Sequence, residues 1–140
     1  MKRNVLFVIV YLLGFTAFSQ TQTFFIPDSI PNCEMIKSGT FVNIQSNNVE
    51  LPDYSIVYDG GYVTELISNG EFYLKSQIIF TSDCAYTSNV IEVTIPNYDM
   101  GVGTVINTEI IATDTSHKLL RIKSTYAGKD FYFMLKKIKE

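Results

Sequence analysis

The sequence predicts an all-β domain of about eight strands, arranged as an antiparallel meander that closes, or nearly closes, into a barrel. Three observations predict this class. Short runs rich in Val, Ile, Tyr, Phe and Thr alternate with turn residues along the chain. Beyond the N-terminal segment, no helical stripe of apolar residues extends past about two turns. Successive runs are joined by short connections, which favours antiparallel neighbours and disfavours a sandwich.

The first segment, residues 1–19, has the pattern of a cleaved secretory signal peptide. Lys2 and Arg3 precede an apolar core, and Ala17 and Ser19 occupy the −3 and −1 positions of a cleavage site. The apolar stretch at residues 5–18 is shorter than the about 20 residues that a spanning helix needs. We therefore expect a secreted or periplasmic protein with no membrane span after signal cleavage.

Residues 20–32 are expected to form an extended N-terminal arm. The segment TQTFFIPDSIP contains two prolines and has no periodicity, and we expect Phe24 and Phe25 to dock on the barrel. Residues 33–140 then form a single β-barrel-like domain.

The first half of this domain contains four predicted strands. Residues 40–44 form the first, and residues 54–58 and 62–67 flank Asp-Gly-Gly, a strong hairpin signal. After Ser-Asn-Gly, a long strand is predicted at residues 71–80. Its period of two is typical of a half-buried antiparallel strand and places on one face Phe72, Leu74, Ser76, Ile78 and Phe80.

The second half continues the pattern. Residues 84–88 and 90–95 are predicted to form one bent strand that ends at Pro96, because proline cannot donate to a ladder. A loop follows it. Further strands are expected at residues 104–113, 118–126 and 131–139, separated by Asp-Thr-Ser-His and Ala-Gly-Lys-Asp.

The two cysteines, Cys33 and Cys84, are predicted to form a disulfide, since one bridge is the simplest arrangement for two cysteines in an exported protein. Closing this long loop would contribute on the order of 3–4 kcal/mol. Two free thiols are the alternative. A redox pair is disfavoured because redox-active cysteines usually lie close together near a helix start.

Charge and residue types argue against several activities. The chain has 11 basic and 14 acidic residues, and its basic cluster is limited to Lys136, Lys137 and Lys139, so we expect no nucleic-acid partner. His117, the only histidine, lies in a polar turn and with two distant cysteines does not supply a zinc site. No Gly-x-Ser-x-Gly elbow supports a catalytic triad. We expect no cofactor, no metal and no catalytic residues, and keep a hydrolase as a remote alternative.

The predicted function is that of an exported, non-enzymatic binding protein of unknown specificity. A small barrel can enclose one apolar or amphipathic ligand. The alternative is a structural or protein-interaction module of the cell envelope with a side-chain-filled interior. The candidate lining residues, taken from alternating faces, are Tyr54, Ile56, Tyr58, Tyr62, Phe72, Leu74, Ile78 and Phe80.

Three acidic residues, Glu65, Glu92 and Glu109, lie in predicted strands. The favoured interpretation is that all three point outward into solvent. An acid that pointed into the barrel would instead bind a cationic or hydroxylated ligand.

Two short motifs carry a resemblance. The order of CEMIKSGTF, Glu65 and SDCAY resembles a group of small exported bacterial proteins, over roughly Cys33 to Ile95. The resemblance implies a lipocalin-like fold and supplies no catalytic residues. Some members of the group bear the name DNA topoisomerase IV, which the present sequence does not support, because it is short, acidic and without ATPase or strand-cleavage motifs.

Overall fold

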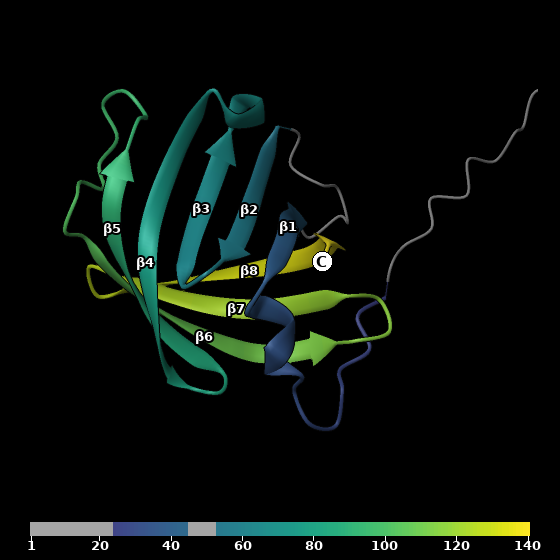
Figure 1. The fold of residues 1–140 in the computed structure, drawn as a ribbon. Coiled ribbons are helices and arrows are strands. Elements are labelled where there is room, and N and C mark those ends of the chain that lie inside the picture. Colours follow the sequence, from purple (N-terminus) through teal and green to yellow (C-terminus); the bar gives the residue numbers. More distant parts are fainter. Residues whose placement is uncertain (1–23, 45–52) are drawn as a thin grey trace, which may run out of the picture.

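The computed structural model describes residues 24–44 and 53–140, which form a closed barrel of eight antiparallel strands (Figure 1). Each strand pairs with the next along the chain, and the last pairs with the first. The all-β meander and its closure are therefore confirmed. The predicted signal peptide and residues 20–23 of the predicted arm lie outside the described residues. The strands are β1 (Gly39–Ile44), β2 (Tyr54–Asp59), β3 (Tyr62–Ile67), β4 (Phe72–Ser82), β5 (Ala85–Val93), β6 (Val105–Asp114), β7 (Leu119–Tyr126) and β8 (Lys129–Lys139).

The β2–β3 hairpin shows how a turn sets which side chains face inward. Gly60 and Gly61 have φ values of +56° and +83°, a left-handed conformation that glycine adopts without steric cost and that two-residue hairpin turns require. The turn pairs Asp59 with Tyr62 and places Tyr58 opposite Val63. Directly paired residues share a face, so Tyr58 and Val63 both point into the barrel, where both are buried.

Two strand boundaries differ from the sequence prediction. The predicted bent strand is observed as β5, and its pairing with β4 shifts register between Lys75 and Ser76, as a bulge does. The last strand, β8, begins at Lys129 rather than at residue 131. Ala127 and Gly128 both have positive φ, so a two-residue turn is enough to pair Tyr126 with Lys129.

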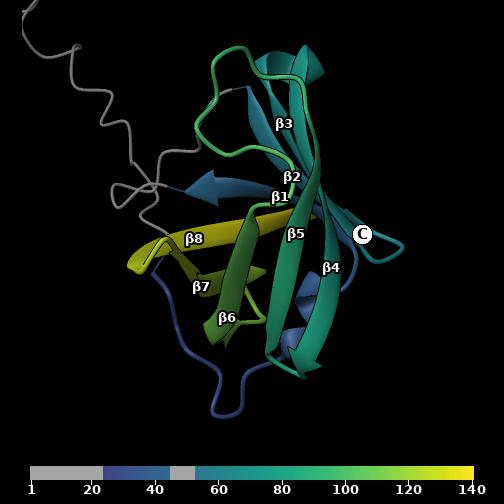
Figure 2. The same ribbon diagram turned by 90° about the vertical axis from the view of Figure 1, so that its left-hand side faces the viewer.

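One end of the barrel is covered by the short 3₁₀ helix η2 (Cys33–Ile36), which lies across it in both ribbon views (Figures 1 and 2). Its Cys33, Met35 and Ile36 side chains are buried and join the main apolar core with Phe41, Ile78, Leu120, Leu135 and other inward-facing residues. The second 3₁₀ helix, η3 (Ser68–Gly70), joins β3 to β4 at the opposite end.

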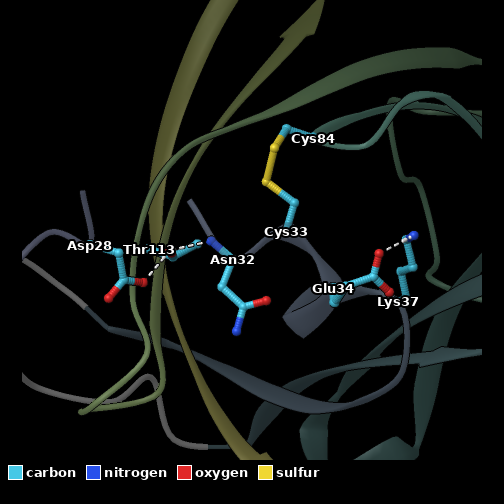
Figure 3. The surroundings of a disulfide bond; sticks show 7 residues. All are labelled: Asp28, Asn32, Cys33, Glu34, Lys37, Cys84 and Thr113. Atoms are coloured by element: carbon cyan, nitrogen blue, oxygen red, sulfur yellow. Dashed lines mark hydrogen bonds and ion pairs between the residues drawn. A yellow bond between two sulfur atoms is a disulfide. The ribbon is translucent and has the colours of Figure 1, made fainter. Parts of the chain in front are cut away.

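The disulfide between Cys33 and Cys84 ties η2 to the turn that joins β4 and β5 (Figure 3). The two Cα atoms are 5.2 Å apart, within the usual range for a disulfide. The predicted pairing is confirmed. The bridge fixes the covering helix against the closed end of the barrel.

The described part of the arm is held to the outside of the barrel by polar contacts. Asp28 accepts a hydrogen bond of 2.6 Å from the Thr113 hydroxyl, and the backbone N–H of Ile26 donates to Asp114 at 2.8 Å. The guanidinium of Arg121 lies 4.3 Å from the ring centroid of Phe25. Phe25 therefore docks as expected, whereas Phe24 is 73% exposed.

Candidate functional site

A cavity of about 370 Å³ lies inside the barrel, toward the end opposite η2. Side chains from all the strands line it, together with two residues from the connection between β5 and β6. Apolar and aromatic groups form most of its wall. The lining residues are Asn43, Tyr54, Ile56, Tyr58, Val63, Glu65, Ile67, Ser76, Tyr86, Ser88, Tyr98, Met100, Ile106, Thr108, Ile122, Ser124, Tyr126, Phe131, Phe133 and Leu135.

Three of the eight predicted lining residues, Tyr54, Ile56 and Tyr58, line this cavity. All three lie on β2, where alternate residues face inward. The aromatic content of the wall is larger than this strand alone supplies, because Tyr86, Tyr98, Tyr126, Phe131 and Phe133 contribute to it.

The other five predicted residues lie elsewhere. Tyr62 is on the outer face, 38% exposed, with the Lys75 ammonium 4.8 Å from its ring centroid. Leu74 and Ile78 are buried without lining the cavity, Phe80 packs on the core, and Phe72 is partly buried at the start of β4.

The hairpin register and the length of β4 explain these differences. Since Tyr58 pairs with Val63, the inward face of β3 carries Val63, Glu65 and Ile67 rather than Tyr62. Strand β4 runs along the barrel from the cavity end to the closed end. Phe80, near its far end, packs on the apolar core, with its ring centroid 5.6 Å from that of Tyr86.

Two pairs of hydroxyl groups face each other among the residues that line the cavity. The hydroxyls of Tyr58 and Tyr86 are 2.7 Å apart, and those of Thr108 and Ser124 are 3.0 Å apart. The Tyr58 ring also packs edge-on against Phe41, with centroids 5.4 Å apart. These pairs satisfy polar groups that burial would otherwise penalise.

Glu65 faces the cavity, so the favoured outward interpretation of this residue is wrong. The Tyr54 hydroxyl donates a hydrogen bond of 2.6 Å to its Oε2 atom. Burial raises the pKa of the Glu65 carboxyl, and the hydrogen bond from Tyr54 opposes that rise. Burial, and then the nearby charge of Glu65, hold the pKa of Tyr54 far above its usual range, so this hydroxyl stays a donor.

The other two strand glutamates lie on the outside of the barrel, as expected. Glu92 accepts a hydrogen bond from the Tyr73 hydroxyl, and both residues are on the exposed surface. Glu109 is 3.3 Å from the Lys123 ammonium. The three glutamates therefore do not converge, and the paired-carboxylate geometry of a glycosidase is not formed by them.

His117 lies in the turn between β6 and β7, away from the cavity lining. Its Nδ1 atom is 2.7 Å from Asp114 Oδ2 and 3.1 Å from the Ser116 hydroxyl. In a catalytic triad, the acid and the nucleophile contact different ring nitrogens of the histidine. Here both contacts are to Nδ1, so the three residues form a turn network rather than a triad.

Within residues 24–44 and 53–140, no group of three or more His, Cys, Asp or Glu side chains could hold a metal ion. In the same part of the chain, no helix is long and apolar enough to cross a membrane. Comparisons of the chain with protein-family models, with curated proteins and with solved structures found no match.

Proposed function

We propose that this chain is an exported, non-enzymatic binding protein whose barrel holds one small apolar or amphipathic ligand. The observation that carries this proposal is the cavity of about 370 Å³ inside the barrel. Its volume lies within the range of small-molecule sites, and its mainly apolar wall with a few placed polar groups has the composition of such sites. The alternative of an interaction module with a side-chain-filled interior does not account for this space.

Topology adds support. An eight-stranded up-and-down barrel is wide enough to hold one small ligand, and lipocalins use this architecture for that purpose. The closed meander, with one end covered by η2, agrees with the lipocalin-like fold that the sequence resemblance implies. The cavity opens at the other end, where Tyr98 and Met100 of the β5–β6 connection contribute to its wall.

Two features support export. The N-terminal segment has the pattern of a signal peptide. The disulfide between Cys33 and Cys84 is of a kind that persists in oxidising compartments and is rare in the cytosol. Both features support the proposed periplasmic or secreted location.

The test is native mass spectrometry of the protein purified from the organism that makes it. We expect a non-covalent adduct of small mass. Substituting Ile106→Trp would fill the cavity, because Ile106 lines it and is only partly buried, and should remove the adduct. The matched control is Val105→Trp on the adjacent residue, which is 52% exposed and should keep it.

A protein that is bare in all three forms, and whose thermal stability does not respond to a panel of lipids, would contradict the binding function. An adduct that survives Ile106→Trp would place the ligand outside the cavity and would contradict the assignment of the site.

A further inference from the structure

The charge of the cavity wall points to the chemistry of the ligand. Glu65 is the only Asp or Glu among the described residues that line the cavity, and none of these residues is Lys, Arg or His. The Tyr54 hydroxyl supplies a single neutral hydrogen bond to Oε2. A carboxylate offers about four acceptor positions, so one hydroxyl leaves most of this capacity unused. Among the described residues that line the cavity, no side chain of opposite charge faces this carboxylate.

The aromatic residues around Glu65 favour a positive group over a negative one. The faces of Tyr and Phe rings carry negative electrostatic potential and attract ammonium groups within about 6 Å. The ring residues of the wall are Tyr54, Tyr58, Tyr86, Tyr98, Tyr126, Phe131 and Phe133. An anionic head group would meet both the Glu65 charge and these ring faces and would be repelled by them.

The electrostatic potential at the cavity mouth is also negative. Tyr98 lines the cavity and is 40% exposed. Burial raises the pKa of Tyr98, and the negative charges of Glu65 and Asp99 raise it further. Both carboxylates therefore act on the entrance, where a negative potential attracts cations and raises their rate of association.

We propose that the ligand is a protonated amine with an apolar body, and that its ammonium group binds Glu65 while the body lies against the aromatic wall. The ammonium supplies the opposite charge that the wall lacks. It donates to the Glu65 carboxylate in a charge-assisted hydrogen bond, which is stronger than a bond from a neutral donor. This inference rests on the proposed function, because it assumes that the cavity is the binding site.

The inference is tested with three probes that share one alkyl chain: decylamine, decanol and decanoate. Their affinities are measured by isothermal titration calorimetry at neutral pH, below the concentrations at which micelles form. We expect decylamine to bind roughly 10-fold or more tightly than decanol, because both can donate to the carboxylate but only the ammonium adds a positive charge to the hydrogen bond. Decanoate should bind most weakly.

The variants test the effect of the Glu65 charge while the shape of the cavity is kept. Glu65→Gln keeps the shape of the side chain and should remove the preference for decylamine, with the affinity for decanol unchanged. The matched control is Glu92→Gln, since Glu92 also accepts a hydrogen bond from a tyrosine but lies on the outer surface. It should leave all three affinities unchanged.

The outcomes are distinguishable. If decanol or decanoate binds as tightly as decylamine, or if Glu65→Gln leaves the preference intact, the amine inference is wrong while the binding function stands. If none of the three probes binds to the wild-type protein or to Glu65→Gln, the binding function and the inference are overturned together.

Discussion

Tyr54 on β2 donates a hydrogen bond of 2.6 Å to Glu65 on β3, inside the barrel wall. The two residues are not directly opposite each other, because Glu65 pairs with Ile56 and Tyr54 with Ile67. They are diagonal neighbours on one face, a separation that a tyrosine side chain can span. The β2–β3 hairpin therefore places a carboxylate and a neutral donor together against the cavity, and the stability of the protein should depend on the charge of that carboxylate.

Glu65→Gln is expected to stabilise the ligand-free protein at neutral pH. Burial raises the pKa of Glu65 above its ordinary value of 4.5, so the folded state binds the proton more tightly than the unfolded state. The stabilisation that comes from the protonated Glu65 carboxyl is fully present below pH 4.5. It is lost as the pH rises through the higher pKa of the folded state. Urea unfolding as a function of pH should show this loss in the wild-type protein and not in Glu65→Gln.

The control for this prediction is Glu92→Gln, which changes an exposed carboxylate with a tyrosine partner. It should follow the wild-type pH profile in the same range. A Glu65→Gln profile that falls in parallel with that of the wild-type protein would show that other groups cause the loss.

The position of Glu65 shows where sequence reasoning reached its limit. Alternation alone predicts which residues of a strand share a face, and it does so correctly for Tyr54, Ile56 and Tyr58. It does not say which face is inward in a strand such as β3, where Tyr62, Thr64 and Leu66 are as apolar as Val63, Glu65 and Ile67. The Gly60–Gly61 turn determines which face of β3 points inward, because its two-residue loop pairs Val63 with the inward-facing Tyr58.

The alternation of apolar residues also does not indicate how far along the barrel a residue lies. The inward face of β4 was predicted from Phe72 to Phe80, but one end of this 11-residue strand is at the cavity and the other is at the closed end. Where the barrel is filled depends on η2, whose Ile36 is fully buried. The sequence predicts the disulfide at Cys33, but neither the helix that begins there nor the packing of Met35 and Ile36 into the core.

Removing the disulfide by the double substitution Cys33→Ala and Cys84→Ala should lower the free energy of unfolding by roughly 3–4 kcal/mol, because a long loop is no longer closed in the unfolded state. The sequence separation of the two residues is 51. Urea unfolding measures the change, and the wild-type protein in reductant should give the same value. Two alkylatable thiols in the wild-type protein, found by non-reducing peptide mapping, would contradict the bridge.

Asp114→Asn should destabilise the protein by about 2 kcal/mol at neutral pH, as expected for losing hydrogen bonds to a buried charged group. Asp114 is 1% exposed. Burial raises its pKa, but hydrogen bonds from the N–H groups of Ile26 and His117, from Ser116 and from the His117 ring outweigh burial, and hold the pKa well below 3.8. Thermal or urea unfolding measures the difference.

The pH dependence has the opposite sign to that of Glu65. Because the folded pKa of Asp114 is lowered, its contribution is present above pH 3.8 and is lost as the pH falls through the folded pKa. Asp114→Asn should lack this acid-dependent step. Asp130→Asn is the control: Asp130 is exposed and accepts one hydrogen bond from Thr125, and its substitution should change stability by less than about 0.5 kcal/mol.

Tyr54→Phe should raise the pKa of Glu65 further, because it removes the hydrogen bond that opposes the effect of burial. The measurement is a titration of the Glu65 side-chain carboxyl by ¹³C NMR. Its midpoint in the wild-type protein should lie above 4.5, and the midpoint in Tyr54→Phe should be higher still. Tyr73→Phe removes the hydroxyl that donates to Glu92 on the outer surface, and it should leave the Glu65 midpoint unchanged.

An unchanged midpoint in Tyr54→Phe would mean that the Tyr54 hydroxyl does not favour the charged form of Glu65. Glu65 would then depend on the ligand alone for a donor, and amine binding should be insensitive to Tyr54.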